Sequence, residues 1–497
     1  MAKSSKSSEH HRVILEHIAH RVMLERGLLP DFSPEVNSEL EAIQPQTKEI
    51  EEALPDLRSL LWCSIDNDDS LDLDQLSVAQ ALPGGLVKIL VAIADVETLV
   101  KPSTAINAHA QHNTTSVYTA AKIFPMLPEK LSNGLTSLNF DVSRPAFIIE
   151  MTVGADGVLR DSSVYRALVH NYAKLAYNSV AAWLEGSAAM PEALAAVDGL
   201  SENLRLQDKI AQAMHRSRHA HGALSLETIQ SRPVFSGEML ASLEEEEKNR
   251  AKEIIEDFMI AANGVTARFL SELGYPTLRR VVRTPKRWER IVAIARENGY
   301  RLSDDPDSKS LETFLVKQKA TDPLHFPDLC LTIIKLLGPG EYAAQPGGKN
   351  MKGHSAGGHF GLAVKNYGHS TAPNRRYPDL ITQRLLLAAL NRQKASYQLD
   401  ELESLAQHCT EAEDAANKVE RQVGKSAAAL LLKTRIGEQF DAIVTGAASK
   451  GTWVRLLKLP VEGKLVAGFR GVDVGDSLRV QLIEIDVEKG YIDFKKV

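Results

Sequence analysis

Cysteine is scarce in this 497-residue sequence, which contains three, namely Cys63, Cys330 and Cys409. They stand far apart without a CxxC pair, so they supply neither a disulfide framework nor a structural zinc site. Isolated cysteines are typical of proteins in a reducing compartment. We therefore predict a cytoplasmic protein without disulfides or structural zinc.

Long apolar segments are also missing. No run approaches the roughly 20 apolar residues that a membrane-spanning helix needs. The first residues, MAKSSKSSEHHRV, are not followed by the apolar stretch of a signal peptide. The sequence therefore predicts no association with a membrane.

A strong positive charge is absent as well. The net charge is −6, whereas wrapping by nucleic acid requires clustered Lys and Arg side chains. Any phosphate-binding site must therefore be local. Two basic stretches are candidates, RRVVRTPKRWER at 279–290 and the pair Arg375 and Arg376, although a run of charge is more often a solvated face.

The sequence does contain enough apolar residues for several cores. Hydrophobic residues make up 44% and charged residues 25%, as in soluble globular proteins. A chain of this length suggests about two to four domains.

Local patterns indicate the α+β class. Helical spacing of apolar residues predicts helices at 11–29, 254–270, 376–392 and 399–432, and Ser33-Pro34 starts another short one. Short β-branched runs predict strands at 86–96 and 147–153, and the Gly- and His-rich interval 343–373 predicts a long loop. We divide the chain into an N-terminal helical element with its linker (1–60), a mixed central domain (61–432) and an all-β unit (437–497).

The most distinctive segment is SIDNDDSLDLDQL at 64–76, where five aspartates fall within nine positions: Asp66, Asp68, Asp69, Asp72 and Asp74. Carboxylates this close repel one another, whereas a hard divalent cation stabilises them. An EF-hand is excluded because Leu71 and Ser77 occupy the positions that require Gly and Glu. A metal site and an acidic surface turn both remain open, and the apolar flanks favour a turn anchored in a core.

This segment resembles the active site of the RNB domain of ribonuclease II-type exoribonucleases, whose aspartates follow the pattern D-x5-D-x-D-D. Asp66, Asp72 and Asp74 match, and Gln75 replaces the fourth carboxylate, whose charge Asp68 or Asp69 would then supply. Further similar blocks follow in order: VAIADV (91–96), TSVYTAAKIFPMLPEKLSNGLTSLN (115–139), AKLAYNSVAAWLE (173–185), GALSLE (222–227), EIIEDFMIAAN (253–263), GHFGLA (358–363) and APNRRYPDLITQRLL (372–386). The resemblance covers about 61–430.

The resemblance implies a Mg²⁺ site, or one for Mn²⁺, with Asp66, Asp72 and Asp74 as ligands or orienting groups. Asp74 is the residue expected to be indispensable. Arg375 is expected to bind phosphate oxygens, and Glu420 to anchor the same region, unless Glu420 is an ordinary exposed helix residue. Arg376 has either a structural or a phosphate-binding role, and Ala372, Asn374 and Gln383 depart from the family pattern.

The resemblance also implies residues that bind RNA. Tyr118 and Tyr177 match positions that contact terminal nucleotides, where stacking holds bases without sequence preference. Glu256 matches the acid that helps to hold the last ribose or base. Leu226 stands where some relatives carry a stacking Phe, so the clamp on the 5′ side of the bound segment is expected to be weaker.

Residues 437–456 and 474–494 resemble the OB-fold of ribosomal protein S1, an RNA-binding barrel. Phe440 and Trp453 would either stack on bases or be buried in its core. Relatives carry two cold-shock barrels before the catalytic domain, and the roughly 60 residues here are too few for them. The N-terminal helices either guide RNA or merely pack on the catalytic domain.

The predicted function is a 3′-to-5′ exoribonuclease that hydrolyses single-stranded RNA to 5′-mononucleotides by metal-ion catalysis. The alternative is a catalytically inactive RNA-binding protein on the same fold, which Gln75 favours. No protein partner can be inferred.

Overall fold

The structure is a computed structural model that describes residues 10–44, 53–228, 231–245, 248–348, 357–448 and 451–497. At its centre is a six-stranded sheet with the order β7-β6-β3-β2-β1-β8, in which β1 and β8 run parallel and the other neighbours antiparallel. The strands are β1 (Cys63–Asp66), β2 (Gln75–Ala81), β3 (Val87–Ala94), β6 (Ser143–Val153), β7 (Leu159–His170) and β8 (Ala173–Ala176).

Both faces of this sheet are buried, which explains the unbroken apolar run of β3. Ile89, Val91 and Ile93 point into the large core that the sheet shares with helices. Leu90 and Ala92 point to the opposite face, where they pack with Trp62 and other apolar side chains. Because successive side chains of a strand alternate between faces, the part of β3 that is covered on both sides, Ile89–Ala94, is apolar throughout.

Helices cover the sheet and lead to the functional residues. They are α4 (Ala105–Asn113), α5 (Tyr177–Leu184), α6 (Glu192–Ala195), α7 (Leu200–Ala220), α8 (Arg250–Glu272) and α12 (Tyr377–Leu390). Asn249 caps α8, its side chain accepting a hydrogen bond from the Lys252 backbone N–H. The helix predicted at 254–270 is thus confirmed and one turn longer at its start.

The predicted N-terminal helices are present as α1 (His11–Glu25) and α2 (Pro34–Ala42). Ile18 and Val22 of α1 pack against Val419 and Val423 of the long helix α13 (Leu399–Leu432). The Glu39 carboxylate of α2 accepts hydrogen bonds from the first two backbone N–H groups of α4. Both helices therefore pack on the central domain.

Three helices form a separate helical lobe, defined here as residues 288–337: α9 (Trp288–Glu297), α10 (Ser308–Thr321) and α11 (Phe326–Leu337). The lobe has its own apolar core, which includes Trp288, Phe314 and Phe326. Small strand pairs complete the domain: β4 (Val117–Tyr118) with β5 (Ile123–Phe124), β9 (Ser231–Ser236) with β10 (Met239–Glu245), and β11 (Thr277–Val281) with β12 (Glu341–Gln345).

The prediction of a long loop at 343–373 is partly wrong. Its first residues belong to β12, which pairs with β11, and Phe360–Leu362 form a short helical turn. The sequence EYAAQ lacks the alternation of a strand, and its conformation follows from pairing with a distant segment. Residues 349–356, the middle of the Gly- and His-rich stretch, lie outside the described residues.

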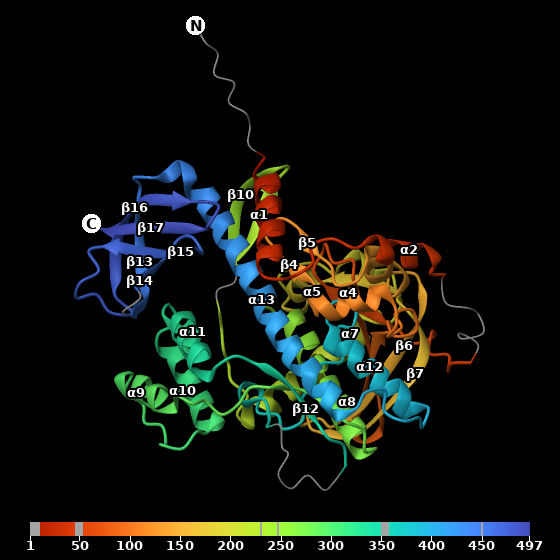
Figure 1. Cartoon of the computed structure of the whole chain (residues 1–497). Helices are drawn as coiled ribbons and strands as arrows, with labels where there is room; N and C mark the ends of the chain where they lie inside the picture. Colours follow the sequence, from red (N-terminus) through yellow and green to blue (C-terminus); the bar gives the residue numbers. More distant parts are fainter. Residues whose placement is uncertain (1–9, 45–52, 229–230, 246–247, 349–356, 449–450) are drawn as a thin grey trace.

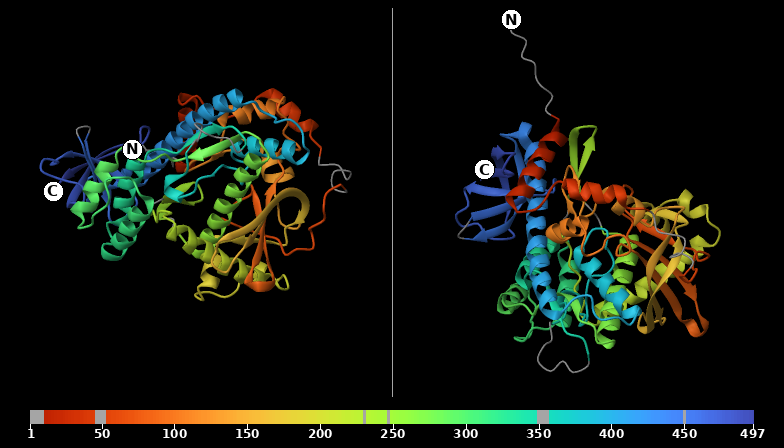
Figure 2. Two further views of the ribbon diagram at one scale, coloured as in Figure 1. Left: turned by 90° about the horizontal axis from the view of Figure 1, so that it is seen from below. Right: turned by 45° about the vertical axis from the view of Figure 1, so that its right-hand side comes forward.

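The C-terminal residues form a closed five-stranded barrel of order β13-β14-β15-β17-β16, as the OB-fold resemblance predicted. Its strands are β13 (Gln439–Ala448), β14 (Gly451–Leu456), β15 (Glu462–Ala467), β16 (Ser477–Asp486) and β17 (Tyr491–Lys496). Figures 1 and 2 show the barrel at one end of α13, which runs along the central domain. The predicted α+β class is confirmed. None of the helices in the described ranges has the length and apolar character needed to cross a bilayer.

Candidate active site

The acidic turn connects β1 to β2 and is anchored in the core, as its apolar flanks predicted. Asp66 ends β1, and its Oδ1 accepts hydrogen bonds from Asn67 N at 2.8 Å and Ser70 Oγ at 2.9 Å. The Leu73 N–H donates to Ser137 Oγ at 2.9 Å, and the Leu73 side chain is buried. The turn therefore has a defined conformation that fixes the directions of its carboxylates.

The aspartates of the turn differ in their environments. Asp74 is buried, and burial raises the pKa of its carboxyl to about 7, with the Asp72 charge adding to the shift and Arg375 opposing it. Burial also raises the pKa of Asp66. Asp68 and Asp69 are exposed and are not among the described residues that line the cavity below, so they do not replace the missing fourth carboxylate.

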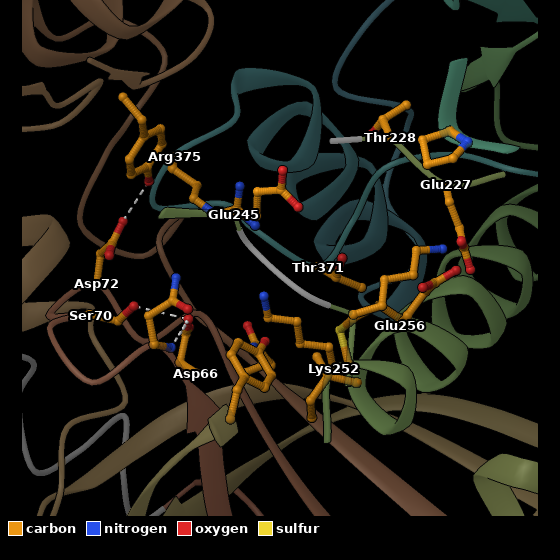
Figure 3. A pocket seen from close by; sticks show the side chains of 18 residues that line it. Asp66, Ser70, Asp72, Glu227, Thr228, Glu245, Lys252, Glu256, Thr371 and Arg375 are labelled. Atoms are coloured by element: carbon orange, nitrogen blue, oxygen red, sulfur yellow. Dashed lines mark hydrogen bonds between the residues drawn. The ribbon is translucent and has the colours of Figure 1, made fainter. Parts of the chain in front are cut away.

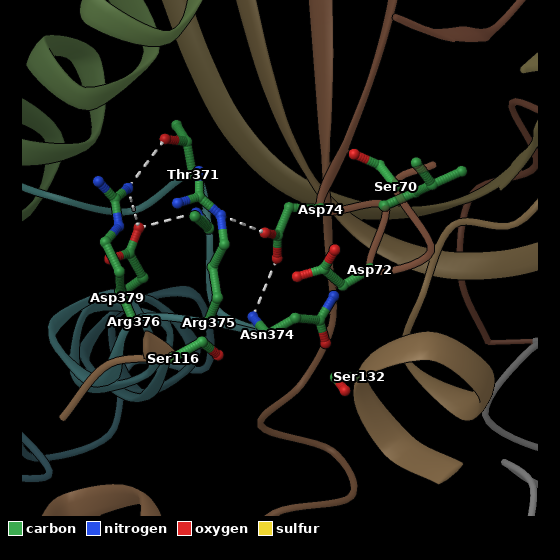
Figure 4. A network of polar contacts seen from close by, with 12 residues as sticks. Ser70, Asp72, Asp74, Ser116, Ser132, Thr371, Asn374, Arg375, Arg376 and Asp379 are labelled. Atoms are coloured by element: carbon green, nitrogen blue, oxygen red, sulfur yellow. Dashed lines mark hydrogen bonds and ion pairs between the residues drawn. The ribbon is translucent and has the colours of Figure 1, made fainter. Parts of the chain in front are cut away.

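Arg375 and Asp74 meet across 301 residues of sequence. Arg375 Nε donates to Asp74 Oδ2 at 3.2 Å, and the Asn374 backbone N–H donates to Asp74 Oδ1 at 2.9 Å. Figure 4 shows the Asp72 carboxylate beside this pair. The Arg375 side chain is 42% exposed, whereas that of Asp74 is 2% exposed. Asp74 thus holds the guanidinium from behind and leaves its other edge open to the cavity.

Arg376, the neighbour of Arg375, points elsewhere. Its guanidinium donates to Asp379 Oδ1 at 2.8 Å, and Asp379 also accepts the Ala372 backbone N–H. Arg376 is not among the described residues that line the cavity. The contacts of Arg376 are those of a structural residue, which is one of the two roles predicted for it.

The departures from the family pattern at 374 and 383 are also accommodated structurally. Asn374 accepts a hydrogen bond from Thr136 Oγ1 at 2.6 Å through its side chain. The Gln383 side chain accepts from Val96 N and donates to Ala94 O. Neither amide lines the cavity. Both are buried: Asn374 ties the Arg375 segment to the Lys130–Leu135 turn, and Gln383 ties α12 to the end of β3.

Tyr118 links two of the predicted carboxylates. Its hydroxyl donates to Asp72 Oδ2 at 3.0 Å, and its backbone N–H donates to Glu420 Oε1 at 2.8 Å. Glu420 lies on α13, and burial raises its pKa. Glu420 is therefore not an ordinary exposed helix residue: it positions the β4 backbone from which Tyr118 projects.

These side chains border a cavity of about 1020 Å³ (Figure 3). Predicted residues that line it are Asp66, Asp72, Gln75, Tyr118, Tyr177, Glu256 and Arg375. Leu226 is half-buried against the lobe and does not line the cavity, although its neighbours Glu227 and Thr228 do. The cavity thus gathers carboxylates, a guanidinium and two tyrosines from across the central domain.

The wall of the cavity that α8 forms was predicted from the sequence only at Glu256. Lys252, Ile255, Glu256 and Met259 of α8 all face the cavity. Their spacing of three and four residues places them on one side of the helix, so the periodicity that identified α8 also carried this signal. Lys252 brings a positive charge opposite the aspartates (Figure 3).

The basic stretch at 279–290 is not part of the site. Arg279 is buried, and its Nη2 donates to Ala267 O and Ser271 Oγ near the end of α8. Arg280 pairs with Glu413 of α13. Neither side chain lines the cavity, so these two arginines connect structural elements and do not form a phosphate-binding patch.

The two barrel aromatics lie outside the cavity. Trp453 is half-buried and alternates with the buried residues Thr452 and Val454, so it faces outward from β14. Phe440 packs at the edge of the barrel core, with its ring centroid 6.3 Å from that of Phe494. Of the two, Trp453 is better placed to stack on a base.

The donor set suits a hard cation. Asp66 and Asp72 present carboxylate oxygens at the cavity, and oxygen is the ligand that Mg²⁺ prefers. The described residues contain no group of three or more His, Cys, Asp or Glu side chains close enough to hold a metal by themselves. Mg²⁺ does not require one, because it is usually bound by one or two carboxylates with waters and a substrate phosphate.

Comparison with known proteins identifies two domains. Residues 55–392 match the RNB domain, and residues 438–497 match the RNase II-type exonuclease C-terminal S1 domain. Ribonuclease R of Escherichia coli is 30% identical over 467 residues, which cover 85% of this chain and 53% of that protein. Ribonuclease R of Aquifex aeolicus is 30% identical over 511 residues, which cover 97% of this chain and 70% of that protein.

Two solved structures illustrate the range of the fold. RNase R of Mycoplasma genitalium in complex with ribose methylated single-stranded RNA aligns with a TM-score of 0.86 at 23% identity, covering 98% of this chain and 78% of that one. Yeast Ssd1, a pseudonuclease, aligns with a TM-score of 0.71 at 15% identity, covering 95% and 57%. The chain spans between half and two thirds of the length of several curated relatives, such as the 58% of Vibrio cholerae ribonuclease R.

Proposed function

Because this chain belongs to the RNB family, we propose that it is a cytoplasmic 3′-to-5′ exoribonuclease that hydrolyses single-stranded RNA to 5′-mononucleotides with Mg²⁺ or Mn²⁺. The observation that carries the proposal is the convergence of Arg375 with Asp66 and Asp72 on one cavity, backed by the buried Asp74. This arrangement provides opposite charges for a phosphate and its counter-ion at the same place.

Asp66 and Asp72 are the proposed direct ligands of the metal, and Asp74 is the charge behind them. When bound, the ion would supply an activated water and stabilise charge on the scissile phosphate. A nearby cation would also favour the ionised form of Asp74, whose pKa burial raises to about 7. The three aspartates thus fit the ion that their crowding requires.

The remaining side chains bind and orient the RNA. Water adds to phosphorus, the bond to the 3′-oxygen of the preceding nucleotide breaks, and the released nucleotide keeps its 5′-phosphate. Arg375, held by Asp74, balances the charge that develops on the phosphate oxygens. Tyr118 and Tyr177 offer aromatic faces to the terminal bases, and Glu256 accepts a hydrogen bond from the last ribose.

The second candidate is an RNA-binding protein without catalytic activity. Gln75 lines the cavity as a neutral residue where the family has a carboxylate, and the fold is shared with a pseudonuclease. Against it stands the intact Asp74–Arg375 pair, in which the buried Asp74 holds the Arg375 guanidinium at the cavity beside Asp66 and Asp72. We therefore favour the enzyme.

The test compares the purified wild-type protein with Asp74→Asn on 5′-labelled single-stranded RNA and Mg²⁺ or Mn²⁺. Stepwise shortening from the 3′ end is expected for the wild type, and a rate at least about 100-fold lower for the variant, because a preorganised charge is lost. Asp69→Asn is the matched control, since Asp69 belongs to the same turn and is exposed. If the wild type and Asp74→Asn both bind RNA and neither shortens it, the protein is an RNA-binding protein without catalytic activity. If the wild type and Asp74→Asn shorten RNA at equal rates, Asp74 has no role in catalysis.

A further inference from the structure

The barrel and the helical lobe are separate units with separate cores. One ion pair joins them: Arg455 of β14 donates to Asp328 of α11 through Nε at 3.2 Å and Nη2 at 2.8 Å. The contact is bidentate, the geometry in which a guanidinium recognises a carboxylate most specifically. Figure 1 shows the barrel and α11 on the same side of α13.

The degree of enclosure distinguishes this pair from surface ion pairs. The side chains of Arg455 and Asp328 are 13% and 12% exposed, whereas Arg479 and Asp441, which also form an ion pair on the barrel, are 55% and 51% exposed. Exposed pairs contribute little because water screens them, but an enclosed charge that loses its partner is strongly unfavourable. The Arg455–Asp328 pair is therefore able to hold two units together.

The pair lies next to the cavity. Pro327, the residue before Asp328, lines it. On the other side, Leu243 of β10 packs into the barrel core, and Glu245 and Lys248, which follow it along the chain, line the cavity. The lobe and β10 thus each contribute a residue to the cavity wall and each contact the barrel, the lobe through the Arg455–Asp328 pair and β10 through Leu243.

The outer face of β14 adds a binding group at this place. Arg455 and Trp453 are two residues apart, so they project from the same face of the strand, while Thr452 and Val454 point into the barrel. The indole packs over Gly446 and Gly451, where an added Cβ would lie 3.4 Å and 3.2 Å from it. The pair that fixes Arg455 against the lobe therefore also fixes the orientation of the strand face that carries Trp453.

We propose that Arg455 and Asp328 act as a clasp that closes a ring around the RNA strand leading to the cavity, and so keep a long RNA bound from one cleavage to the next. This rests on the proposed exoribonuclease function. Both are positioning residues that do not touch the reacting phosphate. The clasp determines which substrates are degraded without release, namely strands long enough to pass through the ring.

The experiment uses the full chain with Arg455→Glu, Asp328→Arg and the double variant that exchanges the two charges. Cleavage of a long 5′-labelled RNA is followed in the presence of excess unlabelled RNA, so that only one binding event is observed. Either single variant should shorten the run of cleavages per event and speed RNA release by at least about tenfold. The double variant should restore both. Hydrolysis of a tetranucleotide, which the cavity alone holds, should not change.

Arg479→Glu is the matched control, because it reverses a charge of the same barrel in the exposed pair with Asp441. Arg455→Met, which keeps length without charge, tests the clasp should Arg455→Glu fail to fold. The proposal is overturned when run lengths are unchanged, when Arg479→Glu shortens them equally, or when the exchanged pair does not recover.

The same release rates, measured in an Asp74→Asn background without hydrolysis, separate the clasp from the proposed function. A wild type that never shortens RNA, combined with clasp variants that release RNA faster, refutes the nuclease and leaves the clasp standing. A wild type that shortens RNA normally, with unchanged release in the variants, refutes only the clasp.

Discussion

At the scale of single residues, the carboxylates of the site have different tasks. Asp66 and Asp72 face the cavity, Asp74 lies behind Arg375, and Glu420 acts through the backbone of Tyr118. The distinction is one of exposure and partners, because the residue types are nearly the same. It predicts that neutral isosteres are tolerated at some of these positions and harmful at others.

Glu420 provides the clearest case. Its role is to accept the Tyr118 N–H, which an amide oxygen also does, so Glu420→Gln should retain most of kcat/KM for RNA. Glu420→Ala leaves that N–H without its acceptor, a loss of about 1–3 kcal/mol, and should raise KM by displacing Tyr118. Steady-state kinetics with both variants provide the check. If the Gln variant is as impaired as the Ala variant, the charge of Glu420 acts directly on RNA or metal.

At the scale of elements, sequence reasoning succeeded where the pattern is local. The helices at 11–25 and 250–272, strand β3 and the barrel all follow from periodicity or from resemblance to a known fold. It failed where structure depends on a distant partner. Strand β12 owes its conformation to β11, a pairing that its own residues do not indicate. Glu420 was expected to anchor the region of Arg375, but the group that it holds, the Tyr118 N–H, follows only from the fold. Arg279 looked like part of a basic surface and is buried, because charge along a sequence does not reveal which face a residue occupies.

Helix α4 contains a histidine, His109, whose contact with the distant residue Phe32 depends on pH. His109 is buried, its ring centroid lies 4.5 Å from that of Phe32, and burial lowers its pKa to about 4. The unfolded chain has a His pKa of about 6.5, so it binds the proton first as pH falls. The stability that neutral His109 contributes is therefore complete above about pH 6.5 and is lost as pH falls toward 4.

Urea unfolding at pH 7 and pH 5 tests this contact. Between these values the wild type should lose about 2 kcal/mol more of its unfolding free energy than His109→Gln does. The pH dependence of the unfolding free energy that remains in His109→Gln comes from other groups. One of them is His359, whose pKa burial also lowers to about 4. Equal losses in the two proteins would show that His109 titrates normally in the folded state.

At the scale of the whole molecule, α13 joins what would otherwise be independent units. Val419 and Val423 pack against α1, and Ala428, Ala429 and Leu432 belong to the core of the barrel. One helix thus contributes side chains to the N-terminal element, the central domain and the barrel. A shared core makes unfolding of one part costly for the others, so a single calorimetric transition is expected.

The turn between β16 and β17 is where this coupling is most easily broken. Gly490 has φ +64°, and a Cβ there would lie 2.8 Å from Lys425 Cβ and 3.0 Å from Ser426 N of α13. Gly471 has a similar φ of +73°, and a Cβ at that position would have no neighbour within 4 Å. Replacing either glycine by Ala costs about 1 kcal/mol for the left-handed backbone, but at Gly490 the collision adds about 1–3 kcal/mol.

Gly490→Ala should therefore lower the melting temperature more than Gly471→Ala does, and it should split the barrel transition from that of the central domain. Differential scanning calorimetry of the two variants and the wild type measures both effects, with Gly471→Ala as the control for the backbone cost alone. Matching thermograms for the two variants would mean that the barrel does not depend on its contact with α13. The ring closed by Arg455 and Asp328 would then have no fixed support on that side, because α13 is the element that holds the barrel against the central domain.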